Sequence, residues 1–264
     1  MQRAVTKSPK IYFIVASLIL ALALPADSVI NDPDLSVHYG FEEGKGAVVK
    51  DDSPNGNDAD IIGKADWEDG PPGFGKALIF DGKTDVDMRG KDFKKKPKDA
   101  VSICVWVKHD GAGDAQSLFD VISDVPGAQG LYHVEIRPGG FRWFHRNTAN
   151  TTIFNINPGP VLPSDKWLHF AGTYDSKGGK VVTYVDGKQT HDAEGDGELA
   201  QNWNQRAGIG HHVQGRWLSG SIDEFYMFTR ALTASEVKAV MDGEFLSVQP
   251  KDRLTTKWAK IKTK

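Results

Sequence analysis

The feature that most constrains the fold of this chain is the recurrence of turn residues between short β-rich segments, from about residue 35 to residue 228. Turn sequences such as Pro138-Gly139-Gly140 and Asp186-Gly187 supply positive or fixed φ angles, so the chain must reverse direction repeatedly. Many short strands separated by such turns are typical of an all-β, antiparallel sandwich or jelly roll. A parallel sheet would require strands that alternate with helices, and the sequence shows no such alternation.

The segments expected to form strands are rich in β-branched and aromatic residues. They cover residues 35–41, 77–80, 101–108, 131–136, 141–145, 167–174, 180–185 and 221–228. Asp186-Gly187 provides the strongest hairpin signal, at the tip of an apolar strand. Within residues 141–146, alternation predicts two faces, of which one must belong to the core: Arg142, Phe144 and Arg146 on one side, and Phe141, Trp143 and His145 on the other.

One short C-terminal helix is predicted after the last strand. Thr233 and Glu236 have the spacing of a capping box, in which each side chain bonds to the backbone of the other residue. Leu232 and Val237 occupy the positions of a hydrophobic staple, and Gly243 follows the expected end. We therefore expect a closing helix with a structural role.

The two ends of the chain differ from the body. Residues 1–26 combine a basic head with an uncharged apolar run of about 14 residues, which predicts a signal peptide. The run is shorter than the roughly 20 residues of a spanning helix, so we expect no membrane span after cleavage, with a short uncleaved anchor as the alternative. Residues 27–246 form the expected domain, and residues 247–264 a basic, disordered tail. The predicted location is secreted, periplasmic or on the cell surface.

Charge and cysteine content exclude several classes. The domain from residue 27 to residue 246 carries a net charge of −11, which disfavours nucleic acid and polyanionic glycans and suits hard cations such as calcium. Cys104 is the single cysteine, so an internal disulfide is excluded.

The order of motifs resembles the laminin-G-like, concanavalin A-like jelly-roll family of secreted bacterial proteins. The resemblance rests on a series of segments along residues 35–242: Val37–Gly46, the loop Asp51–Ala59, Gly75–Gly82, Ile103–Lys108, Lys166–Asp175, Tyr184–Lys188, Gly220–Phe225 and Arg230–Val237. It implies a concanavalin A-like jelly roll. Because this fold hosts lectins, adhesion domains and some hydrolases, it does not by itself imply one function.

No catalytic pair of carboxylates is visible. Glycosidases place two carboxylates about 5–9 Å apart, but Glu135 stands alone in its segment. Asp223 and Glu224 are adjacent, so a regular strand would point them to opposite faces. We expect a non-catalytic recognition module that binds extracellular or cell-surface carbohydrate, or an extracellular protein. The alternatives are a hydrolase or lyase whose carboxylates converge from different strands, Glu135 among them, and a structural or adhesion component of the cell envelope.

A structural calcium ion is a further hypothesis. Asp52 and Asn57 lie in a loop that offers carboxylate, amide and backbone oxygens, which calcium prefers. The resemblance adds Asp223, because the acidic residue of the closing strand often approaches this loop in the family. The predicted metal ligands are thus Asp52, Asn57 and Asp223. The alternative is that Asp52 and Asn57 only shape turns and that Asp223 bonds to backbone.

Two segments offer the mixture of aromatic and polar residues that a sugar site needs, namely residues 141–146 and 203–206. Trp106, Trp167 and Tyr184 lie within apolar segments and are expected in the core. The pair His211-His212 is interpreted as surface histidines, because no third metal ligand is evident. The ligand-binding residues stay open at this point.

Overall fold

The computed structural model describes residues 32–111, 113, 115–123, 130–157 and 159–244. Within these residues sixteen strands and one helix follow in chain order. The first eight strands are β1 (Leu35–Tyr39), β2 (Val48–Val49), β3 (Ala59–Ile62), β4 (Trp67–Asp69), β5 (Lys76–Asp81), β6 (Asp85–Asp87), β7 (Ala100–His109) and β8 (Gln116–Ile122). The remaining elements are β9 (Gly130–Arg137), β10 (Gly140–Arg146), β11 (Thr152–Ile156), β12 (Leu168–Asp175), β13 (Lys180–Val185), β14 (Lys188–Glu194), β15 (Arg206–Ile209), β16 (Ser219–Phe228) and α1 (Ala234–Met241).

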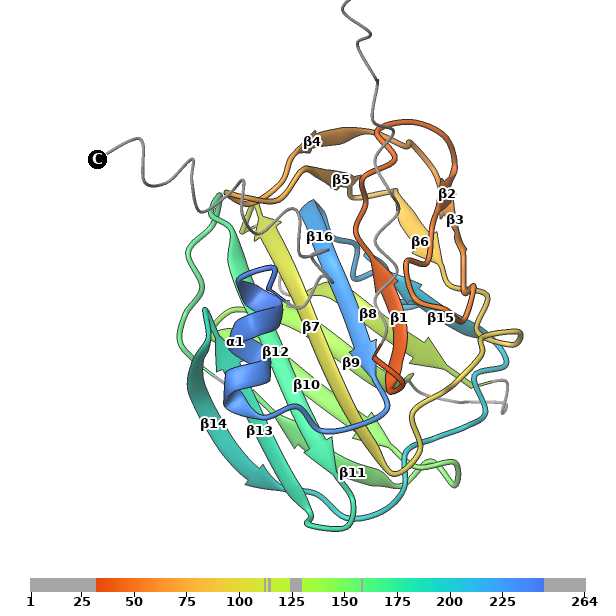
Figure 1. Cartoon of the computed structure of the whole chain (residues 1–264), viewed down its shortest axis with the longest axis vertical. Helices are drawn as coiled ribbons and strands as arrows, with labels where there is room; N and C mark the ends of the chain where they lie inside the picture. Colours follow the sequence, from red (N-terminus) through yellow and green to blue (C-terminus); the bar gives the residue numbers. More distant parts are fainter. Residues whose placement is uncertain (1–31, 112, 114, 124–129, 158, 245–264) are drawn as a thin grey trace, which may run out of the picture.

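The strands form two antiparallel sheets that pack face to face. Sheet A has the order β14-β13-β12-β7-β16-β5-β4, with β1 paired to the second half of β16. Sheet B has the order β11-β10-β9-β8-β15-β6-β3-β2. In Figure 1, α1 lies over β7, β12 and β13 of sheet A, with strands of sheet B behind them. This arrangement confirms the predicted all-β sandwich with one short C-terminal helix.

Aromatic side chains fill the space between the sheets. Trp143 is wholly buried and contacts Phe154 and Phe170, with ring centroids 4.7 Å and 6.3 Å apart. Opposite it, Gly172 leaves room for the indole, because a Cβ at this position would lie 2.7 Å from the Trp143 ring. Phe141 and His145 are also fully buried. The predicted division of residues 141–146 into two faces is therefore confirmed, and the face with Trp143 is the one that belongs to the core.

The predicted hairpin turn and the predicted cap of the C-terminal helix are both present. Asp186 and Gly187 both have positive φ angles, 49° and 71°, and connect β13 to β14, as a two-residue hairpin loop requires. Thr233 caps α1, and Glu236 completes the capping box. Leu232 and Val237 are buried under the helix in a second apolar cluster together with Cys104. This cluster covers part of the outer face of sheet A.

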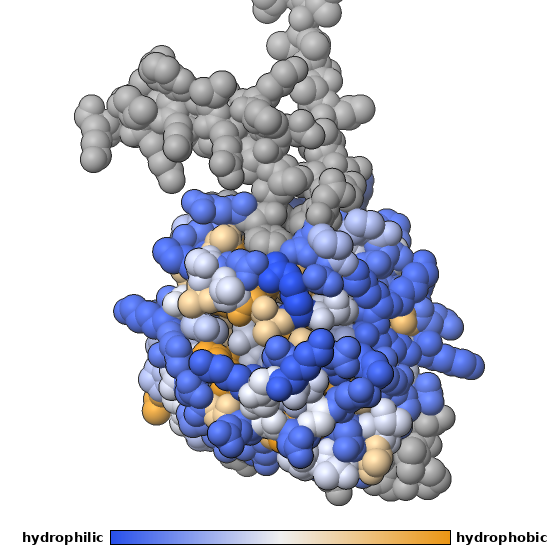
Figure 2. Space-filling view, turned by 60° about the horizontal axis from the view of Figure 1, so that its bottom comes forward, coloured by the Kyte–Doolittle hydropathy of each residue, from blue (hydrophilic) through white to orange (hydrophobic). Residues whose placement is uncertain are grey.

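The remaining surface is mainly polar. Figure 2 shows a hydrophilic surface with small, separate hydrophobic areas. Among the described residues, the exposed large hydrophobic side chains are Ile62, Val161 and Val213. No helix in the described part of the chain is long and apolar enough to cross a membrane. The predicted signal peptide and basic tail lie outside the described residues.

Three aromatic predictions, those for Trp106, Trp167 and Trp203, need correction. Trp106 packs against Phe74 on the outer face of sheet A, with ring centroids 6.0 Å apart, and Trp167 lies under the Lys108 ammonium. Both are partly exposed, so neither belongs to the core between the sheets. Tyr184 is buried as predicted, in the core cluster beneath α1. Trp203, expected at a sugar site, is wholly buried and contacts Phe93.

His145 provides a test of this core. Its ring lies 4.1 Å from the Tyr132 ring, and neither ring nitrogen has a hydrogen-bond partner. Burial holds the pKa of His145 well below its ordinary value. The unfolded chain binds a proton below about pH 6.5 and the folded chain does not, so stability is lost as pH falls below that value. His145→Phe removes the titrating group. Between pH 7.5 and pH 5, the free energy of unfolding of the variant should therefore rise by about 2 kcal/mol relative to that of the wild type.

Urea unfolding at the two pH values measures this gain. The control is His191→Gln, a half-buried histidine on the edge strand β14, which should change stability by less than about 0.5 kcal/mol. If His145→Phe lost the same amount of stability at both pH values, the claim that His145 is neutral and unpaired in the folded core would be contradicted.

Candidate functional site

Sheet B presents a polar outer face along β9 and β10. His133, Glu135 and Arg137 alternate with inward-facing residues on β9, while Arg142, Phe144 and Arg146 do so on β10. The antiparallel register places Arg142 opposite Glu135 and Phe144 opposite His133. Of the two faces predicted for residues 141–146, the one with Arg142, Phe144 and Arg146 is therefore on the solvent side of sheet B.

Glu135 is the centre of this face. Its carboxylate is wholly buried, and three arginines surround it. Arg137 Nε donates to Oε2 at 2.9 Å, Arg142 Nη1 donates to Oε2 at 3.3 Å, and Arg216 Nη1 donates to Oε1. Burial alone would raise the pKa of Glu135, but His133, Arg216 and Arg137 hold it well below its usual range. Glu135 is therefore ionised and fully engaged within the protein.

This environment argues against the predicted role of Glu135 in hydrolysis. A general acid needs a raised pKa and an accessible proton, and Glu135 has neither. The neighbouring Asp120 has its pKa raised by burial to about 7, yet it is also wholly buried and paired with Arg206 at 3.2 Å. Glu135 and Asp120 are thus both buried in ion pairs with arginines and do not form an exposed catalytic pair.

A basic pocket lies beside Glu135, with a volume of about 110 Å³. Its walls come from β9, β10 and the segment after β15: Gly130, His133, Arg142, Phe144, Arg146, His212, Gln214 and Arg216. The Phe144 ring lies between two guanidinium groups, 4.9 Å from Arg142 and 4.6 Å from Arg146. His212 packs against His133 with ring centroids 4.6 Å apart.

A wider hollow adjoins the basic pocket at Arg216. It has a volume of about 440 Å³ and is lined by Gly113, Ala115, Gln116, Gly215, Arg216, Trp217 and Ser219. Trp217 is partly exposed, and its ring stacks on His211 at a centroid distance of 3.6 Å, with an angle of 13° between the planes. This hollow, named here the Trp217 hollow, combines an oriented aromatic face with polar groups, as a sugar site needs.

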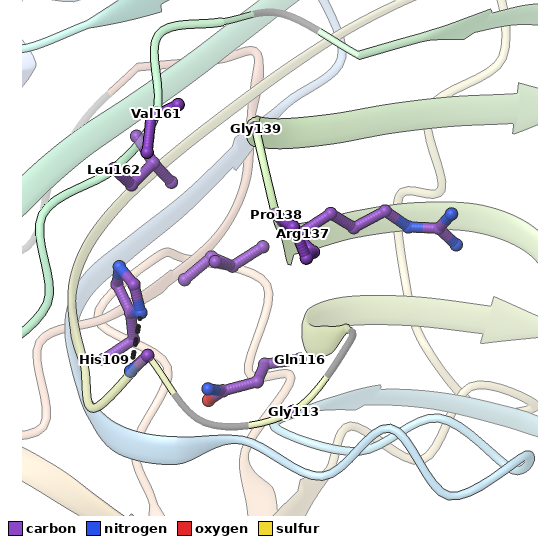
Figure 3. Close-up of a pocket in the computed structure, with 10 residues that line it drawn as sticks. His109, Gly113, Gln116, Arg137, Pro138, Gly139, Val161 and Leu162 are labelled. Carbon is purple, nitrogen blue, oxygen red and sulfur yellow. Dashed lines mark hydrogen bonds between the residues drawn. The ribbon is translucent and has the colours of Figure 1, made fainter.

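A third, more apolar pocket of about 160 Å³ shares Gly113 and Gln116 with the Trp217 hollow. Figure 3 shows Gln116, His109 and Leu162 around this pocket, while the Arg137 guanidinium points away from it. The three hollows thus adjoin one another, from the basic pocket on sheet B to this apolar pocket.

Sequence reasoning found only half of this site. It pointed to the segment 141–146 without choosing between its two faces, and it missed Trp217 and Arg216. His212 is buried against His133, so its interpretation as a surface residue is wrong. The missed segment, residues 211–217, mixes histidine, glutamine, arginine and tryptophan. That is the same signal that pointed to residues 141–146.

The acidic residues of β16 lie on the opposite side of the sandwich. β16 pairs with β5 through residues 219–222 and with β1 through residues 225–228. Between these stretches a β-bulge interrupts the register, and Glu224 has a positive φ of 50°. The bulge breaks the alternation that was expected to point Asp223 and Glu224 to opposite faces. Both side chains are buried, and the charge of Glu224 raises the pKa of Asp223.

The structure does not bring the three predicted metal ligands together in one set of contacts. Asn57 uses its whole side chain inside the protein, since Nδ2 donates to Ser36 O and Lys94 O, and Oδ1 accepts from Lys94 N. Asp52 lies 3.4 Å from His38 Nδ1, and His38 Nε2 lies 2.9 Å from Glu224. Asn57 therefore fits the alternative, in which it shapes the loop.

Asp223 differs from the other two. Oδ1 accepts from Glu224 N at 2.8 Å, while the buried Oδ2 has no hydrogen-bond partner. Burial and the charge of Glu224 raise the pKa of Asp223 to about 9. Gly70 passes directly over this atom, because a Cβ there would lie 2.5 Å from Oδ2. Among the described residues, no group of three or more histidine, cysteine, aspartate or glutamate side chains is arranged to hold a metal ion.

The two-sheet sandwich with a closing helix defines a jelly-roll protein. A family model described as the concanavalin A-like lectin/glucanases superfamily matches residues 80–238. The chain belongs to this superfamily, as the order of its motifs predicted. A comparison with curated proteins found none whose sequence matches this chain.

Several solved structures share the fold. Domain 4 of AbnA, an extracellular GH43 arabinanase from Geobacillus stearothermophilus solved with arabinotriose, has a TM-score of 0.61 and 19% identity, over 79% of this chain and 98% of that chain. The binding domain of Paraclostridial Mosquitocidal Protein 1 has a TM-score of 0.61 and 16% identity, over 80% and 52%. The botulinum neurotoxin serotype D ligand-binding domain, solved with N-acetylneuraminic acid, has a TM-score of 0.54 and 14% identity, over 82% and 51%. This chain thus spans about half the length of the two toxin domains.

The Glu135 cluster makes a stability prediction. Glu135→Gln removes the carboxylate that three arginines share, and it should destabilise the fold by about 3 kcal/mol, as loss of one partner of a buried ion pair does. The matched control is Asp60→Asn on β3, whose exposed pair with Arg89 should contribute less than about 1 kcal/mol. Thermal unfolding of both variants measures the difference. Equal small losses would contradict a central role for Glu135.

Proposed function

We propose that this protein is an exported, non-catalytic module that binds carbohydrate in the Trp217 hollow and the adjoining basic pocket. The observation that carries the proposal is the partly exposed Trp217, held flat against His211 at the wall of a hollow of about 440 Å³. A sugar ring stacks its C–H groups on such an aromatic face, while nearby polar groups bond to its hydroxyls.

The fold and the chemistry of Glu135 support the same proposal. Domains of the same fold were solved with arabinotriose and with N-acetylneuraminic acid. Both oxygens of Glu135 are engaged by arginines, which favours recognition over hydrolysis. The opposite side of the sandwich is covered in part by α1 (Figure 1), whereas the basic pocket opens on the outer face of sheet B.

The first test is loss of carbohydrate binding in Trp217→Ala. We expect a panel of oligosaccharides that includes arabinotriose and trigalacturonate to contain ligands of the wild type. Trp217→Ala should weaken each of them at least tenfold, because the stacking surface is lost. The control is Trp167→Ala, a partly exposed tryptophan beside Lys108 on sheet A, which should leave binding unchanged. Isothermal titration calorimetry gives both dissociation constants, and equal effects of the two variants would contradict the proposed location.

We also propose that Asp223 helps to hold a structural calcium ion, together with backbone oxygens and Glu42. The unpartnered, buried Oδ2 of Asp223 supports this proposal, since such an atom is costly unless something bonds to it. Glu42 accepts from Gly75 N at 3.0 Å. Gly75 O in turn accepts from Gly70 N at 3.0 Å, and Gly70 is the residue that passes over Asp223 Oδ2. Asn57 is a structural residue in this proposal.

Thermal unfolding with EDTA and with added calcium tests the proposal. At a calcium concentration 100 times Kd, the native state should gain about 2.7 kcal/mol, and Asp223→Asn should abolish that gain. Asn57→Ala is the control, because it removes loop hydrogen bonds and should destabilise the protein equally with and without calcium. No gain in the wild type would overturn the calcium proposal while leaving the carbohydrate proposal intact.

A further inference from the structure

The basic pocket contains more positive charge than the protein needs for its own ion pairs. Arg137, Arg142 and Arg216 surround the single carboxylate of Glu135. Within this cluster three guanidinium groups thus face one negative charge. Two of them, Arg142 and Arg216, also line the basic pocket. An excess of positive charge therefore lies at the wall of a hollow.

The other groups around the pocket do not cancel this charge. His133 and His212 have their pKa values lowered by burial, His212 to about 3, so both rings are neutral at pH 7. The neighbouring acids of sheet B, Asp85 and Asp120, share one arginine, Arg206, at 2.7 Å and 3.2 Å. Together they leave at most one negative charge, against the two guanidinium charges that Glu135 does not neutralise. Among the described residues that line the pocket, none is a carboxylate.

The arginines are also partly withdrawn from water. The side chain of Arg142 is 16% exposed and that of Arg216 is 27% exposed. An ion pair formed at such a site is screened less than one on the open surface. Each guanidinium has five N–H donors in a planar fork, and Glu135 uses only part of them. The fork matches the two oxygens of a carboxylate or sulfate group.

We infer that the basic pocket selects anionic carbohydrate, binding the carboxylate or sulfate group of one sugar while an adjacent sugar ring stacks on Trp217. Arg216 joins the two sites, because it lines both the basic pocket and the Trp217 hollow. This inference rests on the proposed carbohydrate binding and adds the charge of the ligand to it.

The charge of the whole domain limits the kind of anion. Residues 27–246 carry a net charge of −11, which repels densely charged polymers at a distance. A nucleic acid or a highly sulfated chain would meet this repulsion along its whole length. A glycan with an isolated charge beside neutral rings can bind to the local excess of arginine, and the acidic domain around the pocket repels it little.

The experiment compares matched pairs of ligands that differ only in charge. One pair is a galactobiose that carries a single galacturonate residue, as the free acid and as its uncharged methyl ester, and the other is a galactotriose with and without one sulfate ester. Calorimetric titration of the wild-type protein should give at least tenfold tighter binding to the charged member of one pair. The pair that shows this preference identifies the anion as carboxylate or sulfate. Addition of 0.5 M NaCl should reduce the preference.

Variants locate the preference in the pocket. Arg216→Gln and Arg146→Gln should each reduce the ratio of the affinities for the charged and the neutral ligand at least fivefold. Arg89→Gln is the matched control, since Arg89 pairs with Asp60 on β3 and lies outside the pocket. It removes the same unit charge and should leave the preference unchanged.

Each other outcome overturns a defined claim. Equal affinity for charged and neutral ligands, with loss of both in Trp217→Ala, would overturn charge selection and leave carbohydrate binding standing. Absence of binding to all four oligosaccharides and to the wider panel would overturn both. An equal effect of Arg89→Gln and Arg216→Gln would show a general effect of net charge and overturn the role of the pocket.

Discussion

The buried carboxylate of Glu135 is the interaction on which the candidate site depends. It draws Arg137 from the end of β9, Arg142 from β10 and Arg216 from the segment between β15 and β16 into one cluster. Removal of a single charge from water costs several kcal/mol, and only surrounding opposite charges offset it. The same contacts help to hold the segment that carries His212 and Trp217, together with backbone hydrogen bonds such as Ser117 N to Arg216 O.

The two outer faces of the sandwich serve different purposes. Sheet A is covered in part by α1 over an apolar cluster that includes Cys104 and Leu232, and its bulge at Asp223 and Glu224 is wrapped by the segment that contains Gly70. Sheet B has no helix over it among the described residues (Figure 1). Its ion pairs keep the outward charged side chains ordered, which leaves a pre-organised polar surface for a ligand.

The architecture was predictable because turn chemistry and apolar alternation are local. The Asp186-Gly187 hairpin, the Thr233 cap and the two faces of β10 follow from neighbouring residues alone, and all are present. The site depends on contacts between distant segments, which alternation cannot supply. Glu135 meets Arg216 across 81 positions of sequence. The β-bulge at Glu224, which places two adjacent acids together, likewise arises where β16 changes partner from β5 to β1.

The most direct test of the central claim uses the indole N–H signals of the tryptophans in a two-dimensional NMR spectrum. Trp217 stands in the proposed site, whereas Trp106 and Trp167 lie on sheet A and Trp143 is buried in the core. Titration with an oligosaccharide ligand should shift the Trp217 signal progressively and leave the other three in place. Shifts confined to Trp106 or Trp167 would contradict the account, because they would move carbohydrate binding to the opposite face of the sandwich.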